Sequence, residues 1–199
     1  FLSIQSLKDE FQLVAVCDVN KTAMQVASQE HAVKGYADMT EMLKNEELDL
    51  VSLCSPSGCH PEQAILAAQH GLNVISEKPM ACRYQDGVEM VKACDNAGVR
   101  LFVVKQNRFN PPVMAVKELL DNDALGKIYS VQLSCFWNRN ESYYKGSWRG
   151  TKQWDGGILF TQFSHFIDLL LWLIGDIAEL QTMLGNVSSR NDIEFEDSC

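Results

Sequence analysis

The tripeptide Glu77-Lys78-Pro79 is the sharpest chemical signal in the first half of the chain, and it directly follows an apolar run that ends at Ser76. Pro79 lacks a backbone N–H and constrains Lys78 to an extended backbone, so we expect the ammonium to project over the end of a strand. A partly desolvated lysine placed there can hydrogen-bond a substrate hydroxyl and stabilise the alkoxide that develops during hydride transfer. The alternative is a solvated lysine in a turn.

Three polar residues share one face of an otherwise apolar stretch at residues 158–174. Thr161, His165 and Asp168 are separated by four and three positions, which is the spacing of neighbours on a helix surface. An imidazole that titrates near neutrality suits removal of a hydroxyl proton while hydride leaves the same carbon. A lone histidine on an apolar helix is more often a core residue, and it is the alignment of three polar groups that favours catalysis.

A polar and aromatic loop is predicted from Asn138 to Gly157, and it is locally basic in an acidic chain. The loop is too long and too rich in Trp, Tyr, Gly and charge for a simple connector. Arginine offers bidentate hydrogen bonds to a diphosphate, and aromatic rings stack on a base or a sugar. Lys145, Trp148 and Arg149 are therefore candidate phosphate contacts, to a cofactor or to a substrate. An ordinary solvated loop is the alternative.

Two earlier segments also follow predicted strands. The run Cys54-Ser55-Pro56-Ser57-Gly58-Cys59-His60 contains small residues that let the backbone approach a ligand, and its Cys and His spacing matches no common metal site, so no metal is expected. Asp18 ends the strand predicted at 13–17. A carboxylate at that place in a dinucleotide fold binds the adenosine ribose and repels a 2′-phosphate, which favours NAD over NADP. An Asp that starts a turn is the alternative.

The elements that must position these residues alternate between short β-branched runs and helical patterns, which predicts a doubly wound α/β domain with a parallel sheet. Gly71 and Gly98, each just before a strand, are helix stop signals. We place a domain boundary near residue 107, giving an NAD-binding domain at 1–107 and a substrate-binding α+β domain at 108–199. The expected strands are 13–17, 48–53, 74–76, 101–104, 127–137 and 179–185, and the expected helices are 21–28, 60–70, 84–97, 111–122 and 158–174.

Apolar residues at helical spacing between Phe1 and Phe11 predict that the chain opens inside a helix that packs on a sheet. In a sheet of order 3-2-1-4-5-6, the strand before that helix is the central one, and a glycine-rich turn joins the two. We therefore expect a fragment of a longer protein in which the strand at 13–17 lacks a neighbour on its inner side. We likewise expect that the second domain lacks, at 196–199, the element that closes its sheet.

Composition excludes several classes of protein. With 199 residues and 46% hydrophobic content, the chain can bury a core and is not intrinsically disordered. A net charge of -9 provides no overall positive field for nucleic acid or an anionic membrane. The seven cysteines contain no CxxC pair, which is typical of reduced thiols in a cytoplasmic protein. The longest apolar run, Leu169 to Ile174, is too short to span a bilayer.

Glu77-Lys78-Pro79 and the run from Gly156-Gly157 to Asp168 together resemble the Gfo/Idh/MocA oxidoreductases, and the resemblance covers nearly the whole chain. It implies a Rossmann domain joined to a C-terminal domain whose open, mainly antiparallel sheet forms oligomer contacts. It also implies oxidation or reduction of sugars or sugar nucleotides with a nicotinamide cofactor. Lys78 would be the lysine of the family's EKP motif and His165 the histidine of its helix. The family's glycine fingerprint is absent from this sequence.

The inositol dehydrogenase form of that helix carries an aspartate where this chain has Thr161. Thr161-Gln162 and the Ser147-Trp148-Arg149-Gly150 loop are instead similar to the branch that acts on the 3-hydroxyl of UDP-N-acetylglucosaminuronic acid in O-antigen sugar synthesis, although that branch usually has Asn-Gln at the first pair. We expect cofactor contacts at Asp18, Cys54, Ser55, Pro56, His60, Glu77, Lys78, Gln106, Trp148 and Arg149, and substrate contacts at Lys78, Arg108, Lys145, Thr161, Gln162, His165 and Asp168.

The expected activity is hydride transfer between NAD and the C3 carbon of a UDP-N-acetylated uronic acid, with His165 as acid/base and Lys78 polarising the reacting oxygen. We expect a cytoplasmic homo-oligomer, a dimer or a tetramer, whose partner is a small-molecule sugar or UDP-sugar rather than nucleic acid or a membrane. Two alternatives stay open. One is a dehydrogenase of free sugars, inositol or dihydrodiols on the same fold, and the other is a non-catalytic NAD or sugar-nucleotide binding module.

Overall fold

A parallel three-stranded sheet forms the centre of the first half in the computed structural model, which describes residues 2–137, 139–187 and 193–198. Its strands β3 (Leu50–Leu53), β4 (Asn73–Ser76) and β5 (Leu101–Val103) pair in that order. Alternate residues of β3 and β4 are buried, as the two-residue period of a strand requires. The predicted doubly wound α/β fold is therefore confirmed for this half.

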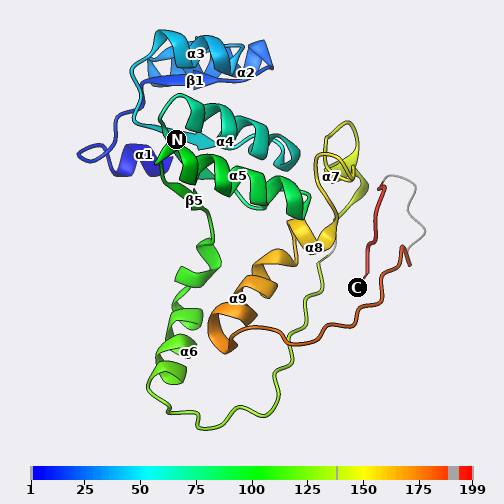
Figure 1. Cartoon of the computed structure of the whole chain (residues 1–199). Coiled ribbons are helices and arrows are strands. Elements are labelled where there is room, and N and C mark those ends of the chain that lie inside the picture. Colours follow the sequence, from blue (N-terminus) through cyan, green and yellow to red (C-terminus); the bar gives the residue numbers. More distant parts are fainter. Residues whose placement is uncertain (1, 138, 188–192, 199) are drawn as a thin grey trace.

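Helices α4 (His60–Gln69) and α5 (Tyr84–Ala97) lie side by side against this sheet (Figure 1). The face of α4 that packs inward carries Ala64, Ala67 and Ala68, all almost completely buried. Such small side chains let neighbouring backbones approach closely, so α4 can pack close to the sheet and to α5. Gly71 and Gly98 follow the two helices with φ of 75° and 69°, which confirms the predicted stop signals.

A second parallel sheet pairs β1 (Ala15–Cys17) with β2 (Lys34–Tyr36), and α2 (Lys21–His31) and α3 (Met39–Asn45) pack on it. Among the described strands, β1 pairs with β2 alone and is not hydrogen-bonded to the β3–β4–β5 sheet. The sequence does not reveal β2 and α3, because a three-residue strand with a central glycine has no alternating pattern. The helix expected between Phe1 and Phe11 forms over α1 (Leu2–Ser6) and ends in a turn.

The second half begins with the 3-10 helix η2 (Gln106–Phe109), in which the predicted domain boundary falls, and continues with α6 (Pro111–Asp121). In Figure 1, α6 lies at the opposite end of the molecule from β1, α2 and α3, and α9 (Ser164–Ile174) lies beside it. A short helix, α7 (Glu141–Tyr144), interrupts the predicted loop. None of the described helices is both long enough and apolar enough to cross a membrane.

The single helix expected at 158–174 is divided into α8 (Ile158–Thr161) and α9. The Ile158 carbonyl accepts from both Gln162 N and Phe163 N, at 3.0 and 2.7 Å, which widens the turn between the two helices. Gly157 precedes α8 with a φ of 114°, and Gly175 ends α9 with a φ of 117°. The apolar period continues across the break, so the period alone could not indicate it.

The strands expected at 127–137 and 179–185, and with them the antiparallel sheet, are not formed in the described residues. The part of this half that the structure describes contains a single isolated antiparallel bridge, between Gly185 and Ser198. A strand needs a neighbouring backbone to hydrogen-bond, and no described strand lies beside either segment. Large side chains such as Tyr129 and Phe136 are accordingly 85% and 98% exposed.

Candidate active site

A cavity of about 210 Å³ lies where the loops after β3 and β4 meet the second half of the chain. The carboxyl edge of a parallel sheet is the usual place for a ligand in this architecture. The first half contributes Ser55, Ser57, His60, Glu77, Lys78 and Pro79 to its lining, and the second half contributes Tyr143, Trp148, Arg149, Asp155, Thr161 and Gln162.

Lys78 connects the two halves across this cavity. Its Nζ donates to the Thr161 carbonyl oxygen in α8 at 2.7 Å. Its own backbone N donates to Glu77 Oε2 at 3.1 Å, and Glu77 N donates to Leu53 O at the end of β3 at 3.0 Å. Burial lowers the pKa of the Lys78 ammonium, and the charges of Glu77 and Asp155 partly oppose that shift. The lysine is therefore half-buried and directed toward the second half.

His165 lies in the first turn of α9 and is 7% exposed. Burial lowers the pKa of His165, and the positive charges of Lys78 and Lys105 lower it further, while Asp168 and Glu77 oppose them. His165 follows the Lys78 hydrogen-bond acceptor, Thr161, by four residues in the chain. The histidine lies just beyond Thr161, whose carbonyl oxygen accepts from Lys78 and whose hydroxyl donates to the Gly157 carbonyl oxygen at 3.0 Å.

Arg108 and Asp168, both predicted substrate contacts, bind one another. Arg108 Nε donates to Asp168 Oδ2 at 2.8 Å and Nη2 donates to Oδ1 at 2.6 Å, while Lys105 Nζ lies 3.7 Å from Oδ1. Burial alone would raise the pKa of Asp168, but the hydrogen bonds from Arg108 and the charge of Lys105 outweigh it and lower that pKa. The pair joins η2 to α9 and lies outside the lining of the cavity.

The basic loop is organised by stacking of cations on aromatic rings. The guanidinium carbons of Arg139 and Arg149 lie 4.5 and 4.9 Å from the centre of the Tyr143 ring, and Arg149 also lies 5.0 Å from the Trp148 ring. These are favourable cation–π distances. Gln162 Nε2 donates to the Tyr143 hydroxyl at 3.4 Å. The stack therefore holds Trp148 and Arg149 at the wall of the cavity.

Asp155 and Tyr143 line the cavity but are not among the predicted site residues. Asp155 is 5% exposed, and its Oδ2 accepts from Gly150 N at 2.8 Å. Burial raises the pKa of this carboxyl, while the Gly150 hydrogen bond and the charges of Arg149 and Lys78 oppose the shift. The sequence analysis did not single out Asp155. Its position directly before Gly156-Gly157 is the signal that could have singled it out.

Other predicted contacts lie outside the lining. Asp18 directly follows β1 and is exposed, and its Oδ1 accepts from Asn20 N at 2.8 Å. Ser55, by contrast, belongs to the lining, and its hydroxyl donates to Gln63 Oε1 at 2.5 Å. The residues outside the lining are Asp18, Cys54, Pro56, Gln106, Arg108, Lys145, His165 and Asp168.

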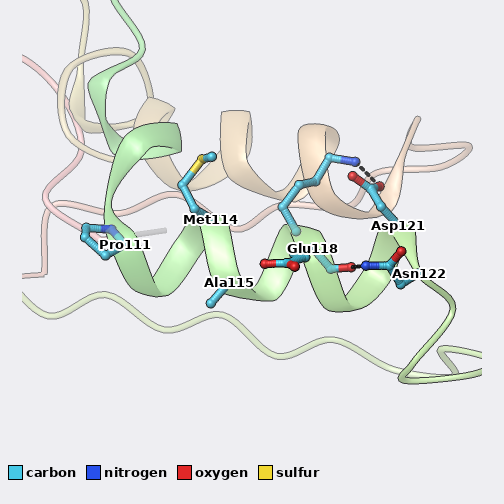
Figure 2. A pocket seen from close by; sticks show the side chains of 7 residues that line it. Pro111, Met114, Ala115, Glu118, Asp121 and Asn122 are labelled. Carbon is cyan, nitrogen blue, oxygen red and sulfur yellow. Dashed lines mark hydrogen bonds and ion pairs between the residues drawn. The ribbon is translucent and has the colours of Figure 1, made fainter.

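A larger hollow of about 570 Å³ runs along α6 (Figure 2). Its lining comes from that one helix and its C-terminal cap, Asn122. Lys117 pairs there with Asp121, and Asn122 Nδ2 donates to the Glu118 carbonyl oxygen at 2.9 Å. None of the predicted site residues lies in it. The smaller cavity at Lys78 is therefore the candidate active site.

The chemistry of that cavity fits one end of a nicotinamide dinucleotide. Trp148 offers an aromatic face, Glu77 a carboxylate that can accept from ribose hydroxyls, and Arg149 and Lys78 positive charge. Pockets for whole ligands measure about 300–1,000 Å³, so a cavity of 210 Å³ suits the nicotinamide end and not the entire dinucleotide.

Residues 1–105 match the family described as the Gfo/Idh/MocA oxidoreductase family with an NAD-binding Rossmann fold, and residues 113–199 match the Gfo/Idh/MocA C-terminal domain. The chain belongs to the Gfo/Idh/MocA oxidoreductases. The resemblance inferred from Glu77-Lys78-Pro79 and the histidine helix is thereby confirmed.

Relatives within the Gfo/Idh/MocA family act on different sugars. The WlbA dehydrogenase of Bordetella pertussis, solved with NADH and UDP-GlcNAcA, superposes with a TM-score of 0.94 and is 44% identical, covering 98% of this chain and 59% of that chain. D-apiose dehydrogenase of Paraburkholderia graminis is 30% identical over 91% of this chain and 48% of its own length. 2,7-Anhydro-N-acetylneuraminate hydratase of Mediterraneibacter gnavus is 32% identical over 80% of this chain and 42% of its own length. The chain thus spans about half the length of these curated relatives.

Proposed function

We propose that the chain carries the active site of an NAD-dependent oxidoreductase that transfers hydride between C3 of a UDP-N-acetylated uronic acid and nicotinamide C4. The observation that carries this proposal is the 2.7 Å hydrogen bond from Lys78 Nζ to the Thr161 carbonyl oxygen. It brings the ammonium of the Rossmann half to the helical segment that leads to His165. The similarity to WlbA, whose structure holds NADH and UDP-GlcNAcA, supports the choice of substrate.

Lys78 and His165 have different roles at the reacting hydroxyl. The lowered pKa of His165 keeps its imidazole neutral at neutral pH, so that it can accept the hydroxyl proton. The Lys78 ammonium stabilises the negative charge that develops on the oxygen. Bound nicotinamide supplies the acceptor for hydride in oxidation and its donor in reduction. In oxidation the carbon therefore loses hydride to the cofactor and its hydroxyl proton to His165.

The remaining site residues bind and orient. Glu77, Ser55, Trp148 and Arg149 hold the nicotinamide end, and Asp18 at the tip of β1 holds the adenosine ribose and disfavours NADP. Gln162, in the lining, is assigned to the substrate. The contacts proposed at Cys54, Pro56, Gln106 and Lys145 complete the cofactor and substrate sets.

The environment of Thr161 favours the nucleotide-sugar branch over a polyol dehydrogenase. The polyol form uses an aspartate at this place, and an aspartate can exchange a proton with a substrate hydroxyl. Thr161 is 7% exposed, and its hydroxyl donates to the Gly157 carbonyl oxygen. A hydroxyl used in this way holds α8 together and does not replace an acid/base carboxylate.

The test is a substrate screen with the purified full-length protein, following NADH absorbance. We expect turnover of UDP-N-acetylglucosaminuronic acid and a much lower rate with UDP-N-acetylglucosamine, free N-acetylglucosamine or inositol. If only a free sugar or inositol were turned over, the proposed substrate would be wrong, but the proposed hydride transfer would still hold. Retained NAD with no turnover of any sugar would overturn the enzymatic function and leave a binding module.

A further inference from the structure

His60 is a buried histidine that the proposed reaction does not use. It begins α4 and is 1% exposed. Its Nδ1 lies 2.9 Å from the Pro79 carbonyl oxygen, and its Nε2 lies 2.9 Å from the Ser55 carbonyl oxygen. Ser55 belongs to the loop after β3 and Pro79 to the loop after β4, so a single imidazole joins the two loops that form one side of the cavity.

We propose that His60 is a positioning residue that fixes the backbone on the far side of Lys78. This inference rests on the role of Lys78 in the proposed function. On its near side, Glu77 N donates to the Leu53 carbonyl oxygen at 3.0 Å. On its far side, Pro79 O is held by the imidazole. With the main chain fixed before and after it, Lys78 extends from a defined origin to the Thr161 carbonyl oxygen.

The chemistry of the imidazole suits this bridge. Either ring nitrogen can carry the proton that one of the two contacts needs, and a ring with both protons makes both contacts. A buried carbonyl oxygen that loses its donor carries the desolvation cost of an unmade hydrogen bond, so each loop whose carbonyl oxygen accepts from the ring is stabilised where it is. Because both nitrogens already face carbonyl oxygens, His60 acts through Lys78 and not by binding the ligand with its ring nitrogens. This replaces its expected role as a direct cofactor contact.

Two substitutions, each of which replaces one ring nitrogen with an amide nitrogen, separate the two contacts. His60→Asn places an amide nitrogen near the position of Nδ1, so it keeps a donor for Pro79 O. His60→Gln places its amide nitrogen near Nε2, so it keeps a donor for Ser55 O. If the ring acts on Lys78 through Pro79, the asparagine variant must preserve Lys78 better than the glutamine variant. If His60 only filled space in the core, the two variants would affect Lys78 equally.

The experiment uses the full-length protein with two measurements, the NMR titration of the Lys78 amine in protein isotopically labelled at lysine, and steady-state kinetics with NAD and UDP-N-acetylglucosaminuronic acid. Displacing a catalytic group costs up to about 100-fold, so we expect His60→Gln to lower kcat by about 10- to 100-fold with KM little changed. In His60→Gln, the titration of the Lys78 amine should move toward that of an ordinary lysine. In His60→Asn, it should stay at the wild-type position, and kcat should stay within about threefold of the wild-type value.

His70→Asn is the matched control. His70 Nδ1 also contacts a carbonyl oxygen, that of Leu66 at 2.9 Å, but at the exposed far end of α4. It should change neither measurement. Equal behaviour of His60→Asn and His60→Gln in the Lys78 titration, or an unchanged titration in both, would overturn the proposal. A wild-type protein without turnover would reject the proposed function instead, and the titration would still decide whether His60 positions Lys78.

Discussion

At the residue scale, the proposed mechanism depends on how burial and charge act on two basic groups. Burial lowers the pKa of both Lys78 and His165, and the positive charges of other basic groups lower both pKa values further. A base with a lowered pKa is deprotonated and ready at neutral pH, whereas an ammonium must stay charged to stabilise an oxyanion. Glu77 and Asp155 supply the negative charge that opposes deprotonation of Lys78. The proposed mechanism therefore assigns opposite protonation states to two basic groups.

Removal of either group should abolish most of the turnover. We expect Lys78→Met and His165→Asn each to lower kcat by about 100-fold or more, because a positioned acid/base or charge-stabilising group contributes about that factor. NAD binding, measured by fluorescence titration of the full-length protein, should persist in both variants. Lys152→Gln is the control, since Lys152 is an exposed cation of the basic loop outside the cavity lining. Near-normal turnover in Lys78→Met or His165→Asn would remove that residue from the mechanism.

The acid limb of the rate profile should respond to the charges around His165. In sugar oxidation the imidazole must be neutral, so kcat should fall as the pH drops through the pKa of His165. Lys105 lowers that pKa, so Lys105→Gln should move the limb to higher pH. Asp168 raises it, so Asp168→Asn should move the limb to lower pH. Profiles of kcat against pH test the two signs, and a shift of both variants in the same direction would contradict this assignment.

At the element scale, the sequence predicted the strands and helix ends that hydrophobic periodicity and helix-stopping glycines encode. The strands before Ser55 and Lys78 formed as β3 and β4, and the stop signals at Gly71 and Gly98 ended their helices. Features set by tertiary contact were not predictable in this way. The break before α9 depends on a widened turn, and the expected strand at 127–137 lacks a described partner. At the site, sequence reasoning singled out Lys78 and His165 by type and place, but the burial of Asp155 appears only in three dimensions.

Gly35 shows how one atom can determine the packing of an element. A Cβ at this position of β2 would lie 2.2 Å from Met24 Sδ and 3.1 Å from Ser28 Cβ, both on α2. We therefore expect Gly35→Ala to displace the Met24 side chain and to crowd Ser28, and to destabilise the protein by about 1–3 kcal/mol, as overpacking does. Gly87→Ala in α5 is the matched control, because its Cβ would have no neighbour closer than 3.7 Å. Thermal unfolding should show a lower Tm only for Gly35→Ala, and equal melting of the two variants would contradict this account.

At the scale of the whole molecule, the proposed site depends on how closely the two halves approach one another. The Lys78 side chain donates to Thr161 O at 2.7 Å, and Gly58 N donates to the Trp154 carbonyl oxygen at 3.1 Å. Both contacts border the same cavity, whose lining includes Ser57 beside Gly58 and Asp155 beside Trp154. The cavity is therefore a property of the junction, and neither half contains a complete site.

Gly58 is the position at which this junction is most sensitive. A Cβ there would lie 2.3 Å from the Gln153 carbonyl oxygen and 2.9 Å from Trp154 Cε3, so the backbone of the second half must move away. We expect Gly58→Ala to reduce kcat by about tenfold or more, because small misplacements across a site cost one to two orders of magnitude. Gly35→Ala, whose clash lies within the first half, provides a comparison with a similar loss of stability. We expect the two variants to have a comparable Tm, measured by thermal melting, but a far lower kcat in Gly58→Ala than in Gly35→Ala. Equal kcat values would show that the junction does not set the geometry of the site.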